Sequence, residues 1–308
     1  NIYLNNGKVK GNTASVDGGG IYVSKGDVTY KDGEEQSIVV SGNTAANGAG
    51  IYIKDGNLHM ANGKITGNII NGIGNGGGIY IENGDFTIES GEVSGNTLTS
   101  GQGAGVYIVG SGGKGNFTMN GGEIKENVTS GNDGGGVYIN GGNFTLNRGS
   151  ITGNSATEGG GVYLNNGNFS LVTGEISGNI ASGNGGGVYL VGEDCEYRLK
   201  NGSITGNEAE NGGGVYLANG SFILADNRND TGSISENSAS ESGGGIYIAG
   251  EGDFTMNGGT VMRNSSTGNN GGGIFLNGGN FTLNYGNISS NTSEQMGGGV
   301  YLYGGTFL

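Results

Sequence analysis

Carboxylate side chains are the residues of this chain best suited to chemistry, because paired Asp or Glu groups about 5–9 Å apart can cleave glycosidic bonds. The richest groups stand in two short segments, Glu193, Asp194 and Glu196 in the first and Asp226 and Asp230 in the second. Asp- and Asn-rich segments also suit hard cations such as Ca²⁺, although no spaced Asp-x-Asp repeat occurs there. We expect solvated loop carboxylates, no catalytic residue and no cofactor, with Ca²⁺ at these acidic loops as the alternative.

Imidazole and thiol groups occur only once each in the sequence. His59 stands between Leu58 and Met60, and Cys195 has no second Cys with which to form a disulfide. A catalytic thiol needs a neighbouring group, such as His, that lowers its pKa. The sequence therefore predicts a protein that is not an enzyme.

The composition limits the class of protein further. Gly fills 75 of 308 positions, Pro and Trp are absent, and 13 basic residues face 27 acidic ones, for a formal net charge of −14. The lack of Pro and of a strict three-residue Gly period excludes collagen, and the short apolar runs exclude a transmembrane helix. A negatively charged surface repels a phosphate backbone, so we expect no nucleic-acid partner. The acidic balance and the low Lys count favour an extracellular location.

The elements that position these residues follow from an internal repeat. The string Gly-Gly-Gly, then Val or Ile, then Tyr recurs with spacings from 25 residues (Val137 to Val162) to 31 residues (Val106 to Val137). Each copy holds three short apolar-alternating runs, such as Val-Tyr-Leu, Phe-Ser-Leu and Glu-Ile-Ser within residues 159–183. Runs with a period of two that are too short for a helix indicate strands. Three strands per copy predict an all-β parallel β-helix of about eleven coils, one continuous domain over residues 1–308.

Five columns of apolar residues should face inward, because side chains on a strand alternate between its two faces. In one copy these are Val162, Leu164, Phe169, Leu171 and Ile176, and the other copies carry similar types at the equivalent positions. A core and hydrogen bonds that stacked coils share predict a stability that is collective along the axis. The Gly triplet never opens a helix, so we interpret it as a tight turn and a site of close stacking.

One polar column is Asn in every copy. We predict a structural ladder in which each side-chain amide donates to the amide of the next coil. The same residues suit a turn with a left-handed backbone, and ligand binding is the alternative. The ladder comprises Asn43, Asn68, Asn96, Asn127, Asn154, Asn179, Asn207, Asn237, Asn264 and Asn291.

A second column places Tyr between the two inward residues of the first strand. On stacked strands the rings would lie about 4.8 Å apart as an exposed aromatic stripe. Cross-strand stabilisation is the favoured role, and a platform for sugar rings or a partner protein is the alternative. The candidate partner or glycan surface comprises Tyr52, Tyr80, Tyr107, Tyr138, Tyr163, Tyr189, Tyr216 and Tyr247.

The string ITGNSATEGGGVYL at residues 151–164 resembles the FxxN and GGA[ILV] repeats of polymorphic outer-membrane adhesins. It is also similar to Gly- and Asn-rich repeats of adhesin-like surface proteins. Ile or Val stands where the FxxN motif has Phe, and Gly replaces Ala in most GGA positions. The resemblance, which covers essentially the whole chain, implies a right-handed parallel β-helix of the broad pectate-lyase-like class and a cell-surface setting.

Departures from the repeat mark the corners, where a solenoid usually presents its specificity. Insertions are expected after the first strand (Gly110 to Gly115, Gly192 to Asp194, Gly250 to Gly252) and after the second (Lys31 to Ser37, Asp226 to Thr231). The usual second strand is expected to be missing between Leu4 and Val9.

These observations predict a non-enzymatic extracellular β-solenoid that serves as a surface stalk, fibre or adhesin, secreted or anchored through segments outside the sequence. The expected partner is a surface protein or glycan of a host or neighbouring cell, with end-to-end or lateral self-association also open. No membrane insertion of this segment is expected. The alternative is a carbohydrate-binding or polysaccharide-cleaving β-helix of the pectate-lyase-like or tailspike type.

Overall fold

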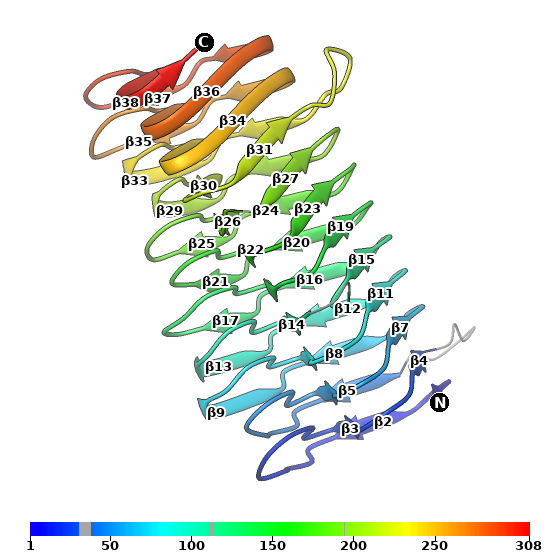
Figure 1. Cartoon of the computed structure of the whole chain (residues 1–308). Helices are drawn as coiled ribbons and strands as arrows, with labels where there is room; N and C mark the ends of the chain where they lie inside the picture. Colours follow the sequence, from blue (N-terminus) through cyan, green and yellow to red (C-terminus); the bar gives the residue numbers. More distant parts are fainter. Residues whose placement is uncertain (31–37, 111–113, 194) are drawn as a thin grey trace. The chain divides into compact units, whose positions relative to one another are not determined.

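The computed structural model describes residues 1–30, 38–110, 114–193 and 195–308. Every element within these ranges is a β-strand, and the chain divides into two compact units, Asn1–Ala156 and Thr157–Leu308. Each unit is a parallel β-helix in which short strands stack coil upon coil (Figure 1). None of the described residues belongs to a helix with the length and apolar character needed to cross a bilayer. The insertion at Lys31 to Ser37, the centre of Gly110 to Gly115, and Asp194 lie outside the described residues.

In the first unit, equivalent strands pair in parallel and in register, as Ile51 with Ile79 and Tyr52 with Tyr80. The first column contains β3 (Ile21–Val23), β6 (Ile51–Ile53), β10 (Ile79–Ile81), β14 (Val106–Val109) and β18 (Val137–Asn140). The second contains β1 (Ile2–Leu4), β4 (Val28–Tyr30), β7 (Leu58–Met60), β11 (Phe86–Ile88), β15 (Phe117–Met119) and β19 (Phe144–Leu146). The third contains β2 (Lys8–Lys10), β5 (Val39–Ser41), β8 (Lys64–Thr66), β12 (Glu92–Ser94), β16 (Glu123–Lys125) and β20 (Ser150–Thr152).

The second unit repeats this plan, but its last coils merge neighbouring strands. The first column contains β22 (Val162–Asn165), β26 (Val188–Val191) and β30 (Val215–Leu217). The second contains β23 (Asn168–Leu171), β27 (Glu196–Leu199) and β31 (Ser221–Leu224), and the third contains β24 (Glu175–Ser177), β28 (Ser203–Thr205) and β32 (Ser233–Ser235). The columns then join in the long strands β34 (Ile246–Met262), β36 (Ile274–Ser289) and β38 (Val300–Phe307).

The core lies inside the coils and confirms the five predicted columns. Val162, Leu164, Leu171 and Ile176 are fully buried, and Phe169 is 1% exposed. Aromatic rings of the second column also stack within each unit. The ring centroids of Phe86 and Phe117 lie 4.6 Å apart, as do those of Tyr197 and Phe222. Stacked coils therefore share one apolar interior in each unit, which supports the predicted collective stability.

The Asn ladder is present in both units. Asn96 donates from Nδ2 to Asn127 Oδ1 at 2.9 Å and to the Ile65 carbonyl at 3.1 Å. Its own Oδ1 accepts bonds from the backbone N–H and the Nδ2 of Asn68 at 3.0 and 2.9 Å. In the second unit Asn207 donates in the same way to Asn237 at 2.9 Å. The amides are buried, so the ladder satisfies polar groups that would otherwise destabilise the core.

The expected left-handed turn lies one residue earlier than predicted. None of the ladder Asn has a positive φ; the residue before each one does, with φ of 61° at Gly67, 57° at Gly95 and 55° at Glu126. The left-handed residue turns the chain at the corner, while the Asn that follows keeps an ordinary backbone and extends its amide into the ladder. Because side chains with a Cβ are strained at positive φ, Gly is the preferred residue at this corner.

The Gly triplet has the predicted role in close stacking. A Cβ on Gly78, the third residue of its triplet, would lie 2.6 Å from the Gly105 carbonyl oxygen and 2.9 Å from Asn96 Nδ2. The first residue of the same triplet, Gly76, has a φ of 68°. Tight turning and contact between coils explain this motif without a bound phosphate.

A fourth short strand, which sequence reasoning missed, follows the Asn corner and belongs to a separate sheet. In the first unit it buries a small satellite core that includes Ala49, Ile70, Leu98 and Ala104. Its residue types vary from coil to coil, so no column marks it in the sequence. The fourth strands are β9 (Ile69–Ile73), β13 (Thr97–Ser100), β17 (Val128–Thr129) and β21 (Ser155–Ala156) in the first unit, and β25 (Ile180–Ala181), β29 (Glu208–Asn211), β33 (Ser238–Ser242), β35 (Ser265–Ser266) and β37 (Thr292–Ser293) in the second.

As predicted, no strand lies between Leu4 and β2 (Lys8–Lys10), but the second strand of this coil is not missing. Strand β1 pairs with β4, so that Ile2 lies opposite Val28 and Leu4 opposite Tyr30. Ile2 to Leu4 is therefore itself the second strand of its coil. The Ile-Tyr-Leu string looks like a first strand, but register is fixed by pairing with the next coil and not by residue type.

Candidate functional site

The predicted Tyr column forms a stacked aromatic ladder in each unit. Ring centroids lie 4.6 Å apart for Tyr52 and Tyr80 and 5.0 Å apart for Tyr189 and Tyr216. The stripe is less exposed than predicted, because Tyr52 and Tyr107 are each only 7% exposed. Each inner ring face contacts a neighbouring ring, so the ladder presents ring edges and hydroxyl groups to its surroundings. A sugar ring that stacks face to face needs a free aromatic face, which the interior of this ladder does not offer.

Burial holds the hydroxyls of Tyr52 and Tyr80 in their neutral form. Burial, together with a hydrogen bond to Glu82 Oε2 at 2.9 Å, raises the pKa of Tyr52. Burial and the neighbouring Tyr107 raise the pKa of Tyr80 to about 12. Neither of these two side chains therefore carries a phenolate that could act as a base near neutral pH.

Acidic residues on the third strands form ion pairs. Lys64 Nζ lies 2.9 Å from Glu92 Oε2, and Lys125 Nζ lies 2.6 Å from Glu123 Oε2 and 3.6 Å from Glu92 Oε1. A hydrogen bond with Ser94, with the two Lys charges adding to it, lowers the pKa of Glu92. A general acid needs a raised pKa, so Glu92 does not suit that role.

The carboxylates in and beside the insertions also form ion pairs. Arg198 Nε lies 2.7 Å from Glu196 Oε1, and Arg198 Nη1 lies 3.3 Å from Asp226 Oδ1. Lys200 Nζ is 3.6 Å from the other oxygen of Asp226. Asp230 accepts hydrogen bonds from within its own loop, including one from the backbone N–H of Asp226 at 3.0 Å. These carboxylates organise the corner and balance basic charges.

Glu193 lies in a shallow acidic hollow of about 180 Å³ that Glu251 and Asp253 also line. Within the described ranges, no group of three or more His, Cys, Asp or Glu side chains has the arrangement needed to hold a metal ion. Asp194 lies outside the described residues. The described carboxylates therefore do not form a cluster of the kind that the Ca²⁺ alternative requires.

The side chains of His59 and Cys195 lie in positions of two different kinds, one on the outward face of a strand and one buried. His59 occupies an outward position of β7, in register with Thr29 and Thr87. Cys195 is 2% exposed and its thiol donates to the Leu164 carbonyl at 3.7 Å. Burial raises the pKa of the Cys195 thiol to about 11, so it is protonated and unreactive near neutral pH.

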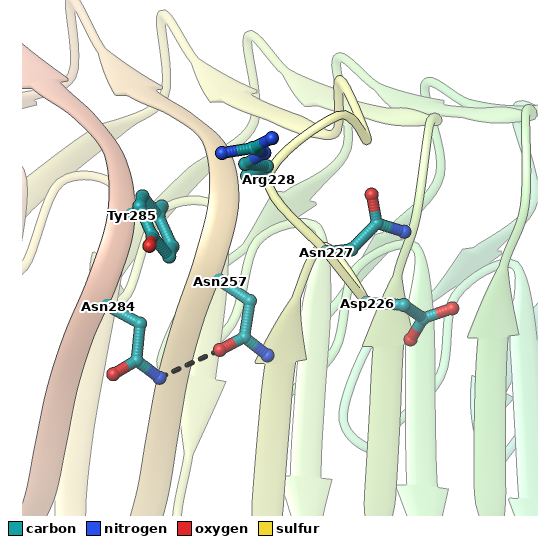
Figure 2. A pocket seen from close by; sticks show the side chains of 6 residues that line it. All are labelled: Asp226, Asn227, Arg228, Asn257, Asn284 and Tyr285. Carbon is teal, nitrogen blue, oxygen red and sulfur yellow. Dashed lines mark hydrogen bonds between the residues drawn. The ribbon is translucent and has the colours of Figure 1, made fainter.

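The second unit has a pocket that sequence reasoning did not predict. It has a volume of about 600 Å³ and opens to solvent at the corner formed by the insertion that begins at Asp226. Figure 2 shows side chains from three successive coils around it, with Tyr285 and Arg228 near the hydrogen-bonded pair Asn257 and Asn284. The lining residues are Asp226, Asn227, Arg228, Asn257, Asn284 and Tyr285.

A departure from the repeat at Tyr285 could have revealed this pocket. Tyr285 directly follows the turn Asn284, where the preceding coil has Gly258 after Asn257. The register of β34 and β36 shifts at this point, so that Tyr285 pairs with Asn257. Its side chain is 59% exposed. An aromatic residue in a column of small or polar turn residues, two coils from an insertion, was the available signal.

The fold agrees with the comparisons with known proteins. Residues 231–249 match the Chlamydia polymorphic membrane protein repeat, which relates the chain to β-helical proteins of the cell surface. The comparisons found no match for the chain among curated proteins or among solved structures. Residues 78–231, half of the 308-residue chain, match the model that describes a right-handed β-helix region. With its parallel coils and inward columns, the chain belongs to the right-handed β-helix family.

Proposed function

We propose that this protein is a non-enzymatic β-helix of the cell surface that acts as a stalk, fibre or adhesin. The observation that carries the proposal is the unbroken set of ladders within each unit. Backbone hydrogen bonds, Asn amides and aromatic rings all join one coil to the next. Such a structure resists bending and proteolysis, because each coil is fixed by both neighbours. The polymorphic membrane protein repeat supports the surface location.

The non-enzymatic assignment is supported by the state of the candidate carboxylates. Glu196 and Asp226 pair with Arg198, and Glu92 pairs with Lys64. A catalytic pair requires one carboxylate with a raised pKa beside one that stays ionised. Candidate partners are a protein or glycan on a host or neighbouring cell, or further copies of the chain.

Surface location and inactivity are tested separately. Antibodies raised against the purified chain should label intact source cells, and external protease should remove the label. Absence of label on intact cells, with signal only after lysis, contradicts the proposal.

Purified chain incubated with a panel of polysaccharides should release no shorter products. Depolymerisation that Asp226→Asn or Glu193→Gln abolishes would establish the alternative, a polysaccharide-cleaving enzyme.

A further inference from the structure

We propose that the pocket between the Asp226–Thr231 loop and Tyr285 binds a sugar that carries a carboxylate group. This inference rests on the proposed adhesive function and deepens it, because it assigns the surface protein a ligand class and a site. All residues of the pocket belong to the second unit.

The shape of the pocket depends on two departures from the repeat and on one Gly between them. The Asp226–Thr231 loop follows β31, Gly258 lies in β34 of the next coil, and Tyr285 lies in β36 of the coil after that. A Cβ on Gly258 would lie 2.6 Å from the Asn227 carbonyl oxygen and 3.2 Å from the Arg228 Cα. The loop backbone therefore lies directly over a position that has no side chain, which allows the loop to sit close to the coil.

The loop is fixed before any ligand arrives. Asp230 Oδ2 accepts bonds from the backbone N–H of Asp226 and from Asn227 Nδ2, each at 3.0 Å. The backbone N–H of Thr231 donates to Asn201 Oδ1 at 2.8 Å, which ties the loop to the coil before it. A pre-organised loop reduces the entropy that a ligand must overcome on binding.

Arg228 gives the lining of the pocket a basic group that can bind an anion. The carboxylate of Asp226 is already balanced by Arg198 and Lys200. Arg228 lines the pocket and makes no ion pair with any of the described acidic residues. A free guanidinium binds a carboxylate through two parallel hydrogen bonds. It is a basic group available for binding on a chain whose formal net charge is −14.

The remaining groups favour a sugar over a peptide. Tyr285 offers an exposed ring on which the apolar face of a pyranose can stack. Asn284 Nδ2 donates to Asn257 Oδ1 at 2.8 Å, which leaves Asn257 Nδ2 as a donor and Asn284 Oδ1 as an acceptor, neither with a partner among the described residues (Figure 2). A neighbouring donor and acceptor suit a pair of vicinal hydroxyls. An aromatic platform with a few convergent polar groups is typical of a small-ligand site.

Calorimetric titration of the full chain with two matched disaccharides tests the proposal. Glucuronosyl-glucose and cellobiose differ only in a carboxylate that replaces one hydroxymethyl group. We expect the acidic sugar to bind about fivefold more tightly, because an ion pair at an exposed Arg contributes on that scale. Arg228→Gln should reduce the affinity for the acidic sugar to that for cellobiose and leave cellobiose binding unchanged. Arg148→Gln, an exposed Arg at a turn of the first unit, is the matched control and should change neither.

The aromatic platform is tested with the same two ligands. Tyr285→Ala should weaken both sugars by a similar factor, and Tyr285→Phe should preserve both affinities. Equal affinity for the two sugars, or no binding of either, overturns the proposal. Tighter binding of an acetylated Glu-Glu dipeptide than of the acidic sugar also overturns it, in favour of an acidic protein partner. Each of these failures leaves the surface labelling of cells unaffected, so it is distinguishable from a failure of the proposed function.

Discussion

The hydroxyl groups of Tyr30 and Tyr197 are the polar atoms least suited to their surroundings. Both side chains are fully buried, and neither hydroxyl has a hydrogen-bond partner among the described residues. Burial raises the pKa of both groups, so both remain neutral. Tyr197 stacks on Phe222, with ring centroids 4.6 Å apart, in a column that carries Phe in the other coils of the second unit. Its hydroxyl therefore adds a desolvation penalty without a compensating bond.

We expect Tyr197→Phe to raise the free energy of unfolding by about 1 kcal/mol, because it removes only the unpaired hydroxyl. Denaturant titration measures the change, and the m-value should stay constant. Tyr216→Phe, on the partly exposed ladder, is the control and should change the stability by less than about 0.5 kcal/mol. A less stable Tyr197→Phe protein would mean that the hydroxyl has a stabilising partner.

The left-handed corner before each ladder Asn provides a second test at a single residue. Glu126 has a φ of 55°, where a side chain costs about 1–2 kcal/mol and Gly does not. Glu126→Gly should therefore stabilise the chain by about 0.5–1 kcal/mol after the entropy of Gly is counted. The reverse change, Gly67→Ala, should destabilise it by about 1 kcal/mol. A Cβ on Gly67 would meet no atom within 4 Å, so steric overlap cannot contribute to that loss. Thermal unfolding measures both variants, and melting temperatures of Glu126→Gly and Gly67→Ala that shift in the same direction would contradict this account.

At the scale of the elements, the buried Asn ladder should contribute more to the free energy of unfolding than side-chain hydrogen bonds between coils at exposed corners, such as that of Asn57 with Asp27. Asn96→Ala would remove the acceptor of the Asn68 backbone N–H and Nδ2 and the donor to the Ile65 carbonyl, while Asn127 Oδ1 keeps its bond from the backbone N–H of residue 96. We expect a loss of about 3 kcal/mol in the free energy of unfolding, because unsatisfied buried polar groups cost about 1–3 kcal/mol each. Urea titration of the purified variant measures it.

The control for this ladder is Asn57, whose Nδ2 donates to Asp27 at an exposed corner at 3.0 Å. Asn57→Ala should cost less than about 1 kcal/mol, because water replaces the lost bonds. Equal losses for Asn96→Ala and Asn57→Ala would show that burial does not decide the contribution of a ladder.

Repetition determined which elements could be predicted from the sequence. The inward columns and the Asn ladder recur in every copy, so alignment of the copies identified them and pairing confirmed them. The fourth strand has no constant residue type, since its inward position is Ile70 in one coil and Leu98 in the next. The second-strand identity of Ile2 to Leu4 depended on register, which only pairing reveals. The pocket at Tyr285 depends on departures from the repeat, which an analysis of shared positions passes over.

At the scale of the whole molecule, the Tyr ladders should make stability depend on alkaline pH. Burial raises the pKa of Tyr80 to about 12 and also raises the pKa of Tyr107 and of Tyr216, above the value near 10 of an unfolded chain. The folded form therefore binds these protons more tightly, and its stability is intact below pH 10 and decreases as the pH rises toward 12. Tyr80→Phe should reduce this loss. Circular dichroism at rising pH measures the loss, and a profile that Tyr80→Phe leaves unchanged would contradict the prediction.

The strict coil-to-coil register has a consequence for how such a chain changes over generations. Within each unit, a coil contacts its neighbours through inward apolar residues, a ladder Asn and Gly positions that recur at equivalent places in the other coils. Recombination between two copies of the repeat can therefore add or delete a whole coil and leave matching faces at the junction. Length is then a trait that selection can adjust in steps, independently of whatever the corner loops recognise.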